Sequence, residues 1–186
     1  MIEQKKIERE AYLKKLIAKR DNGLVKVITG VRRCGKSYLL FTLYRQYLLE
    51  CGVAEEQVVS LALDNALNAK YRDPMALAEY LEAHTPTNGN RYYVLLDEIQ
   101  YVGKKKIQEN PEILISFYDV LNSLLQKGNA DIYVTGSNSK MLSSDIATEF
   151  RGRGDELHIR PLSFSEFYSF RGGDKTDAFS EYLTYG

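Results

Sequence analysis

Short apolar runs alternate with longer amphipathic stretches along the chain from Leu24 to Leu162. A run of four to eight apolar residues is typical of a buried strand, whereas apolar residues three or four positions apart are typical of a helix with one buried face. The alternation of these two patterns predicts an α/β fold in which helices cover both faces of a parallel sheet. We therefore expect three layers, with the sheet in the middle.

Five apolar runs are expected to form the strands, at Leu24–Thr29, Gln57–Leu63, Tyr92–Leu96, Asp131–Thr135 and Leu157–Ile159. Periodicity and capping residues predict helices over Lys5–Arg20, Lys36–Cys51, Pro74–Ala83, from Asn110 and Pro111 to about Gly128, and over Lys140–Phe150, Phe164–Phe170 and Ala178–Tyr185. The polar and basic stretch Val102–Asn110 is expected to be a mobile loop.

The chain has 186 residues, which is the length of one domain. We expect an N-terminal helix in residues 1–22, an α/β core in 23–162 and the start of a helical region in 163–186. Because Thr184–Gly186 brings neither a tail nor a helix cap, we expect the natural chain to continue.

The chain carries 25 basic and 25 acidic residues, so its formal net charge is +0. A dedicated nucleic-acid-binding domain usually has a strong basic excess. Between Met1 and Arg20, however, seven Lys or Arg residues face three Glu residues. This stretch is either a solvated helix face, which is the commoner case, or a surface for nucleic acid.

Several features favour a cytoplasmic protein without a membrane anchor. The N-terminus is charged throughout, unlike a signal peptide, and no run of about 18 apolar residues occurs. Cys34 and Cys51 would lie roughly 25 Å apart on one helix, too far for a disulfide. Two reduced thiols suit the cytosol.

The segment between the first expected strand and the next helix matches the P-loop pattern G-x-x-x-x-G-K-[ST], known as Walker A. Glycines let successive N–H groups turn inward around an anion, and the following helix adds the positive end of its dipole. Lys36 is expected to reach the β- and γ-phosphates, and Ser37 to bind Mg²⁺. Nucleotide contacts are therefore expected from Gly30, Val31, Arg32, Arg33, Cys34, Gly35, Lys36, Ser37 and Tyr38.

Cys34 is expected at the start of that helix beside cations, a setting that lowers the pKa of a thiol. Our hypothesis is that thiol reagents modify Cys34 and that bound ATP protects it.

The third expected strand ends in two adjacent carboxylates, Asp97 and Glu98, as in a Walker B motif. In P-loop proteins the aspartate at this point binds Mg²⁺, and a second carboxylate can orient and deprotonate the attacking water. Guanine-nucleotide switches read their base with an N-K-x-D motif, which this chain lacks. A small-molecule kinase would not need the glutamate to activate water. ATP hydrolysis is therefore favoured over GTP switching and over kinase chemistry.

Polar residues that follow the fourth strand are further candidates. Ser137 or Asn138 would lie beside the γ-phosphate, although a turn of small polar residues explains either one alone. Arg151 and Arg153 precede the fifth strand, and arginine stabilises the charge that develops on a transferred phosphoryl group. A glycine-rich turn with solvated arginines is the alternative, and composition alone favours it.

Taken together, ITGVRRCGKS, YYVLLDEIQ, YVTGSNSKML and FRGRGDELHIRPLSFSEF resemble the bacterial and archaeal AAA-type ATPases that carry a C-terminal domain of unknown function. REAYLKKLI is similar to the segment that precedes the P-loop in those proteins. The resemblance covers nearly the whole chain. It implies a parallel sheet in the order 5-1-4-3-2, Ser137 or Asn138 as the sensor, and Arg153 as the arginine finger with Arg151 as second choice. It also implies that this chain ends where those proteins continue.

Two functions remain open from the sequence. The first is an ATP-hydrolysing motor or switch, and the second is a module that binds ATP to set its assembly state with little turnover. An arginine finger that reaches a neighbour's ATP would require a homo-oligomer. The biological target cannot be read from these residues.

Overall fold

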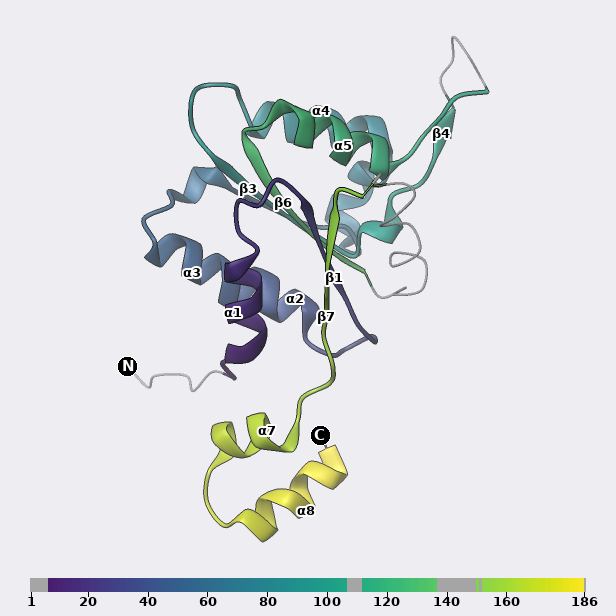
Figure 1. Cartoon of the computed structure of the whole chain (residues 1–186). Coiled ribbons are helices and arrows are strands. Elements are labelled where there is room, and N and C mark those ends of the chain that lie inside the picture. Colours follow the sequence, from purple (N-terminus) through teal and green to yellow (C-terminus); the bar gives the residue numbers. More distant parts are fainter. Residues whose placement is uncertain (1–6, 107–111, 137–149, 151, 186) are drawn as a thin grey trace.

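The computed structural model describes residues 7–106, 112–136, 150 and 152–185. Its centre is a parallel sheet of five strands in the order β2-β3-β6-β1-β7 (Figure 1). The strands are β1 Val25–Thr29, β2 Val58–Ala62, β3 Tyr92–Asp97, β6 Ala130–Gly136 and β7 Gly154–His158. Counted along the chain, this is the expected order 5-1-4-3-2, which is therefore confirmed.

Helices cover both faces of the sheet, so the expected three layers are also confirmed. One face packs against α1 (Glu10–Ala18) and a continuous helical run, whereas the other packs against α4 (Pro74–His84) and α5 (Phe117–Lys127) (Figure 1). Alternate residues of β1, β3 and β6 enter the two cores, as the pleat of a strand requires. On β1, for example, Val27 faces the α4–α5 side and Ile28 faces the α1 side.

The helical run that follows β1 contains an unusual middle section. It consists of α2 (Lys36–Tyr38), a π-helix over Leu39–Tyr44, and α3 (Arg45–Glu50). Short 3₁₀ turns lie elsewhere, at Glu55–Gln57, Ala66–Arg72 and Ile99–Tyr101. None of the helices within the described ranges is long and apolar enough to cross a membrane.

Two C-terminal helices, α7 (Phe164–Arg171) and α8 (Lys175–Tyr185), pack against each other below the sheet in Figure 1. Their contact is aromatic, with the Phe164 ring centroid 5.1 Å from that of Phe179 and 5.6 Å from that of Tyr182. The hydroxyl of Tyr182 also donates a hydrogen bond to the carbonyl oxygen of Leu162 at 2.7 Å.

The prediction of a helix opened by Asn110 and Pro111 is wrong. Helix α5 begins at Phe117, because Ser116 and Asp119 form a capping box in which the Ser116 N–H and hydroxyl both donate to Asp119. The apolar residues just before it form a short strand instead, β5 (Leu114–Ile115). This strand pairs antiparallel with β4 (Lys105–Lys106), so the segment predicted as a loop contains a strand.

Other boundaries differ by a few residues. β7 begins at Gly154 rather than Leu157, because pairing with β1 starts at Val25 and extends the strand. α8 begins at Lys175 rather than Ala178, since the Asp174 carboxylate accepts two N–H groups of its first turn. α1 begins only at Glu10. The helix predicted over residues 140–150 lies outside the described residues, except for Phe150.

A buried ion pair joins the neighbouring strands β1 and β6. Lys26 and Asp131 are 0% and 1% exposed, and the Lys26 ammonium donates to the Asp131 carboxylate. That carboxylate also accepts from the hydroxyl of Tyr133 at 2.6 Å and from the N–H of Asp21 at 2.9 Å. The Tyr133 hydroxyl in turn shares a hydrogen bond with that of Tyr44, in the π-helix. Burial lowers the pKa of Lys26, and the bond to Asp131 opposes this effect.

Replacing Lys26 by Met is expected to lower the free energy of unfolding by about 3–5 kcal/mol, because it leaves the buried Asp131 carboxylate without its counter-charge. Lys19→Met provides the control, since Lys19 forms a more exposed pair with Asp155 and its loss should cost about 1 kcal/mol or less. Urea unfolding at pH 7 measures both. Equal losses in the two variants would contradict a special role for the buried pair.

Candidate active site

The segment Gly30–Ser37, here called the glycine loop, leaves the carboxyl end of β1 and enters α2. Gly30 and Gly35 have φ angles of 147° and 95°, which favour glycine, and Arg33 also has a positive φ of 66°. A Cβ atom at Gly30 would lie 2.3 Å from the carbonyl oxygen of Ile159. Position 30 therefore admits no side chain, and the loop packs backbone to backbone against the exit of β7.

The Lys36 side chain folds back over the glycine loop. Its ammonium donates to the carbonyl oxygens of Gly30 and Val31, both at 3.2 Å, and lies 3.9 Å from a carboxylate oxygen of Glu98. Lys36 is only 4% exposed. The lysine therefore brings the loop and the acidic end of β3 to one place, as the two sequence motifs predict.

The acidic pair at the end of β3 is organised by Thr135, a residue that the sequence analysis missed. Its hydroxyl donates to the carboxylate of Asp97 and accepts from the backbone N–H of Glu98 at 3.0 Å. Thr135 lies on the neighbouring strand β6 and is 0% exposed. The only signal in the sequence was a polar residue near the end of a mostly apolar strand.

Asp97 is 4% exposed, and burial raises its pKa above the ordinary aspartate value. Hydrogen bonds from Ser37 and Thr135 oppose this rise, whereas the nearby carboxylates of Glu98 and Asp64 add to it. Asp64 follows β2 and is a second neighbour that the sequence analysis missed. A cation at this edge of the sheet would relieve the repulsion among these acids.

Ser37 and Asp97 offer the hydroxyl and carboxylate oxygens that Mg²⁺ prefers. Within the described ranges, no three Asp, Glu, His or Cys side chains converge on one point as in an all-protein metal site. That arrangement fits Mg²⁺ bound through one or two protein ligands together with phosphate oxygens and water.

Glu98 is held in a strained conformation. Its φ and ψ of 54° and 52° lie in the left-handed region, which costs a non-glycine residue about 1 kcal/mol or more and is often found at functional sites. The side-chain amide of Gln100 donates to its carboxylate. Lys36, Thr135 and Gln100 thus hold Glu98 from three directions, and the sequence analysis missed Gln100.

The structure separates the remaining loop residues into exposed and buried ones. Val31, Arg32 and Arg33 are exposed, and Tyr38 is half-buried. Cys34 is 3% exposed and packs in the core on the α1 side of the sheet, which argues against the hypothesis that reagents reach its thiol. Cys51 carries the exposed thiol.

Arg153 lies far from the glycine loop of its own chain. Its carbonyl oxygen accepts from the N–H of Val25, at the start of β1, whereas the loop begins at the other end of that strand. Five residues of strand separate Val25 from Gly30, which is about 16 Å. Ser137, Asn138 and Arg151 lie outside the described residues.

Four basic residues of the described part of the N-terminal segment form salt bridges within the chain. Salt bridges join Arg9 to Glu166, Lys14 to Glu10, Lys19 to Asp155 and Arg20 to Asp21. These pairs neutralise much of the expected basic face. In the part of the chain that the structure describes, the proposal of a nucleic-acid surface on this helix therefore gains no support.

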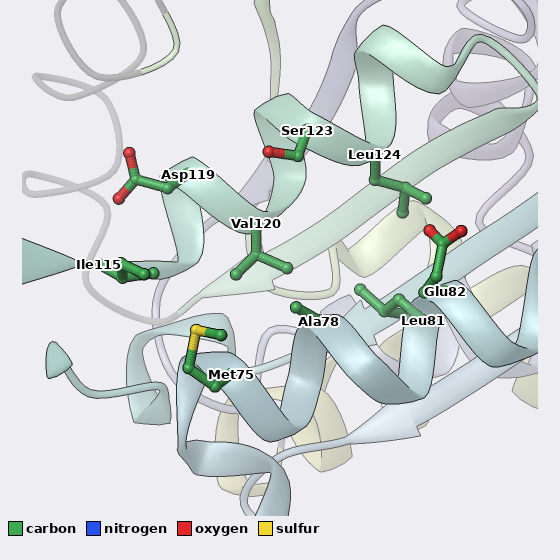
Figure 2. Close-up of a pocket in the computed structure, with 9 residues that line it drawn as sticks. All are labelled: Met75, Ala78, Leu81, Glu82, Ile115, Asp119, Val120, Ser123 and Leu124. Atoms are coloured by element: carbon green, nitrogen blue, oxygen red, sulfur yellow. The ribbon is translucent and has the colours of Figure 1, made fainter. Parts of the chain in front are cut away.

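A separate cavity of about 240 Å³ lies between α4 and α5. Figure 2 shows Met75 and Leu81 of α4 facing Val120 and Leu124 of α5 across it. Its charged lining residues, Glu82 and Asp119, are acidic, which does not suit an anionic ligand. The cavity shares no residue with the glycine loop or with the end of β3.

A family model described as an AAA domain matches residues 22–168, from the segment before β1 into α7. The chain belongs to the AAA domain family. An AAA domain is a nucleotide-binding fold, so the match agrees with the glycine loop and with the acidic end of β3.

Two relatives of this AAA domain are uncharacterised proteins. One, from Haemophilus influenzae, is 37% identical over 186 residues, which are 97% of this chain and 43% of the relative. The other, MJ1544 of Methanocaldococcus jannaschii, is 31% identical over 151 residues, which are 79% of this chain and 29% of the relative. The chain thus spans less than half the length of either one.

Among solved structures, PCH-2 of C. elegans is similar in fold, with a TM-score of 0.54 and 17% identity. The similarity covers 88% of this chain and 42% of that one. At this identity the likeness concerns the fold alone.

The buried carboxylate of Asp97 generates a prediction about stability. Because its pKa is raised on folding, Asp97 stabilises the fold most below about pH 4, and this contribution is lost as the pH rises through the raised pKa. Asp97→Asn is therefore expected to raise the unfolding temperature of the metal-free, nucleotide-free AAA domain at pH 7–8, by about 2–4 °C for each kcal/mol gained.

Thermal unfolding from pH 4 to pH 8 measures this difference between Asp97→Asn and the unmutated chain. Asp64→Asn serves as the control, since Asp64 is exposed and its replacement should change the unfolding temperature less. A lower unfolding temperature for Asp97→Asn at pH 7–8 would contradict the prediction.

Proposed function

We propose that this AAA domain binds ATP with Mg²⁺ and hydrolyses it. The observation that carries the proposal is the meeting of Lys36 and Glu98, whose charged groups lie 3.9 Å apart at the carboxyl ends of β1 and β3. A phosphate-binding cation and a base for water must both act at the terminal phosphate of the nucleotide. This pair has the required chemistry, and the two residues lie at the same edge of the sheet.

In this proposal the glycine loop binds the β- and γ-phosphates. Its N–H groups and the Lys36 ammonium supply positive charge from two sides. Without ligand, the ammonium binds two loop carbonyls and approaches Glu98. Phosphate oxygens, with greater negative charge than carbonyls, replace these partners when ATP binds.

Ser37 and Asp97 hold the metal ion, which neutralises charge on the phosphates when bound. Thr135 keeps the Asp97 carboxylate in place through its hydroxyl. Burial raises the pKa of Asp97, so the metal ion binds better as the pH rises above that value.

Glu98 orients the attacking water and takes its proton. The Gln100 amide donates to its carboxylate, and the Thr135 hydroxyl accepts from its backbone N–H, so both its side chain and its backbone are held in the site. ATP binding alone does not require a glutamate held in a strained conformation by its neighbours. The strain at Glu98 therefore favours hydrolysis over binding with little turnover. The absence of an N-K-x-D motif from the sequence favours ATP over GTP.

We also propose that Ser137 or Asn138 senses the γ-phosphate, and that an arginine from a second copy completes the site. Arg153 is about 16 Å along the sheet from its own glycine loop, so in this proposal it acts on the ATP of a neighbour. Arg151 is the second choice. In the longer relatives, the energy of hydrolysis would drive a movement of the part that this chain does not cover.

Substitutions at Lys36 and Glu98 separate binding from turnover. Lys36→Ala is expected to abolish ATP binding, because the substitution removes the ammonium that folds over the glycine loop. Glu98→Gln is expected to retain binding but to reduce turnover by about 10²–10⁴-fold, since only the base is lost. Titration with a fluorescent ATP analogue and a phosphate-release assay measure the two effects.

Glu50→Gln, an exposed substitution at the end of α3, controls for the loss of a negative charge. Unchanged turnover in Glu98→Gln would remove Glu98 as the base. If the unmutated chain binds no ATP with or without Mg²⁺, the proposed function itself fails for this chain.

A shared site predicts complementation between two inactive variants. Lys36→Ala cannot bind ATP, and Arg153→Ala cannot assist a neighbour, but a mixed assembly contains sites with both residues intact. Mixing the two variants is therefore expected to restore part of the phosphate release, in proportion to the mixed assemblies formed. Purely additive rates at concentrations where the unmutated chain is oligomeric would rule out Arg153 as the shared residue.

A further inference from the structure

Arg9 lies just before α1 and is almost fully buried, with 5% of its surface exposed. A buried arginine is rare because desolvating its charge is costly, and it is usually fully paired. Its backbone has a positive φ of 43°, an unfavourable conformation for a residue with a side chain. Both features indicate that the surroundings hold Arg9 firmly in one place.

The guanidinium of Arg9 joins three segments that are distant in the sequence. Its Nη1 donates to the carbonyl oxygen of Cys34 in the glycine loop at 2.8 Å, and its Nη2 donates to that of Arg160, after β7, at 2.8 Å. Its Nε lies 3.0 Å from a carboxylate oxygen of Glu166 in α7. The guanidinium carbon also lies 4.6 Å from the ring centroid of Tyr12.

The partners of Arg9 are themselves fixed. The second carboxylate oxygen of Glu166 accepts the N–H and the hydroxyl of Ser163, both at 2.8 Å, in the capping box that starts α7. The Tyr12 hydroxyl accepts the N–H of Arg160 at 3.2 Å. Arg9 therefore fastens the glycine loop to a rigid frame made of α1, α7 and the segment between β7 and α7.

The bond to Cys34 has a consequence for the next residue. The Cys34 carbonyl and the Gly35 N–H belong to one planar trans peptide, in which C=O and N–H point in opposite directions. Because Arg9 holds the carbonyl outward, the N–H points away from Arg9, toward the inner side of the loop. A charged donor on the carbonyl also polarises the peptide and strengthens its N–H as a donor.

We propose that Arg9 is a positioning residue for phosphate binding, which orients the Cys34–Gly35 peptide so that its N–H donates to a phosphate oxygen of the nucleotide. The proposal rests on the proposed function, since it requires that the glycine loop binds phosphate. Arg9 acts through the loop backbone and does not itself contact the ligand.

The test compares Arg9→Gln with Arg91→Gln in the 186-residue chain. Arg91 is the control because it binds a backbone carbonyl, that of Gly128, and a carboxylate, that of Asp21, at the opposite end of the sheet. Two ligands are titrated in the presence of Mg²⁺, a fluorescent ATP analogue and, by competition, inorganic tripolyphosphate. Thermal unfolding of both variants shows how far each substitution affects the fold.

Arg9→Gln is expected to weaken binding of ATP and of tripolyphosphate by the same factor, about 10- to 100-fold, as for loss of a charge-assisted hydrogen bond. Arg91→Gln is expected to keep both affinities within about twofold while lowering stability. A loss for ATP without a loss for tripolyphosphate would place the effect of Arg9 on the base or sugar and overturn the proposal.

If Arg9→Gln does not fold, Arg9→Lys decides, because an ammonium lacks the planar fork through which the guanidinium reaches Cys34, Arg160 and Glu166 at once. A loss of about fivefold or more in tripolyphosphate affinity is then expected, and unchanged affinity overturns the proposal. Unchanged affinities in Arg9→Gln, with normal binding by the unmutated chain, overturn this inference and leave the proposed function standing. Failure of the unmutated chain to bind either ligand overturns both.

Discussion

The close contact between Gly30 and the carbonyl oxygen of Ile159 governs the geometry of the whole site. β1 and β7 run parallel up to this point, where the N–H of Ile159 still donates to the carbonyl of Thr29 at 2.8 Å. Beyond it the glycine loop turns away with no space for a Cβ atom at Gly30. The Arg9 guanidinium then links the glycine loop to the segment after β7, because it binds the carbonyl oxygens of both Cys34 and Arg160. The loop is therefore positioned by a backbone contact at Gly30 and by the Arg9 side chain at Cys34.

The buried charged groups of the site all have hydrogen-bond partners within the protein. Lys36 and Asp97 are both buried, and neither is left without a hydrogen bond, because loop carbonyls serve the ammonium and hydroxyls serve the carboxylate. Thr135 links the two acids of β3 through one oxygen. When phosphates bind, they replace partners of protein groups that are already buried. The protein side of the site therefore needs little further desolvation.

Residues close together in the sequence made the fold and the centre of the site predictable. Strand periodicity gave the sheet, the resemblance gave its order, and the two motifs identified the loop and Asp97–Glu98. The missed residues, Thr135, Gln100 and Arg9, act through contacts that depend on their packing, and two of them lie on other segments. The start of α5 was missed, although Ser116 and Asp119 have the spacing of a capping box. The burial of Cys34 was missed, because the position of a residue in the motif does not show which way its side chain points.

The π-helix after the glycine loop sets how this part of the chain tolerates changes in length. Each π turn takes about one residue more than an α turn, because its hydrogen bonds run from i to i+5. Deleting one residue within Leu39–Tyr44 would therefore restore an α-helix and leave the side chains before and after it in the same rotational phase. Deleting one residue from α3 would instead rotate the side chains beyond the deletion by about 100° about the helix axis. In evolutionary terms, the π-helix is the place where this helical run can lose a residue.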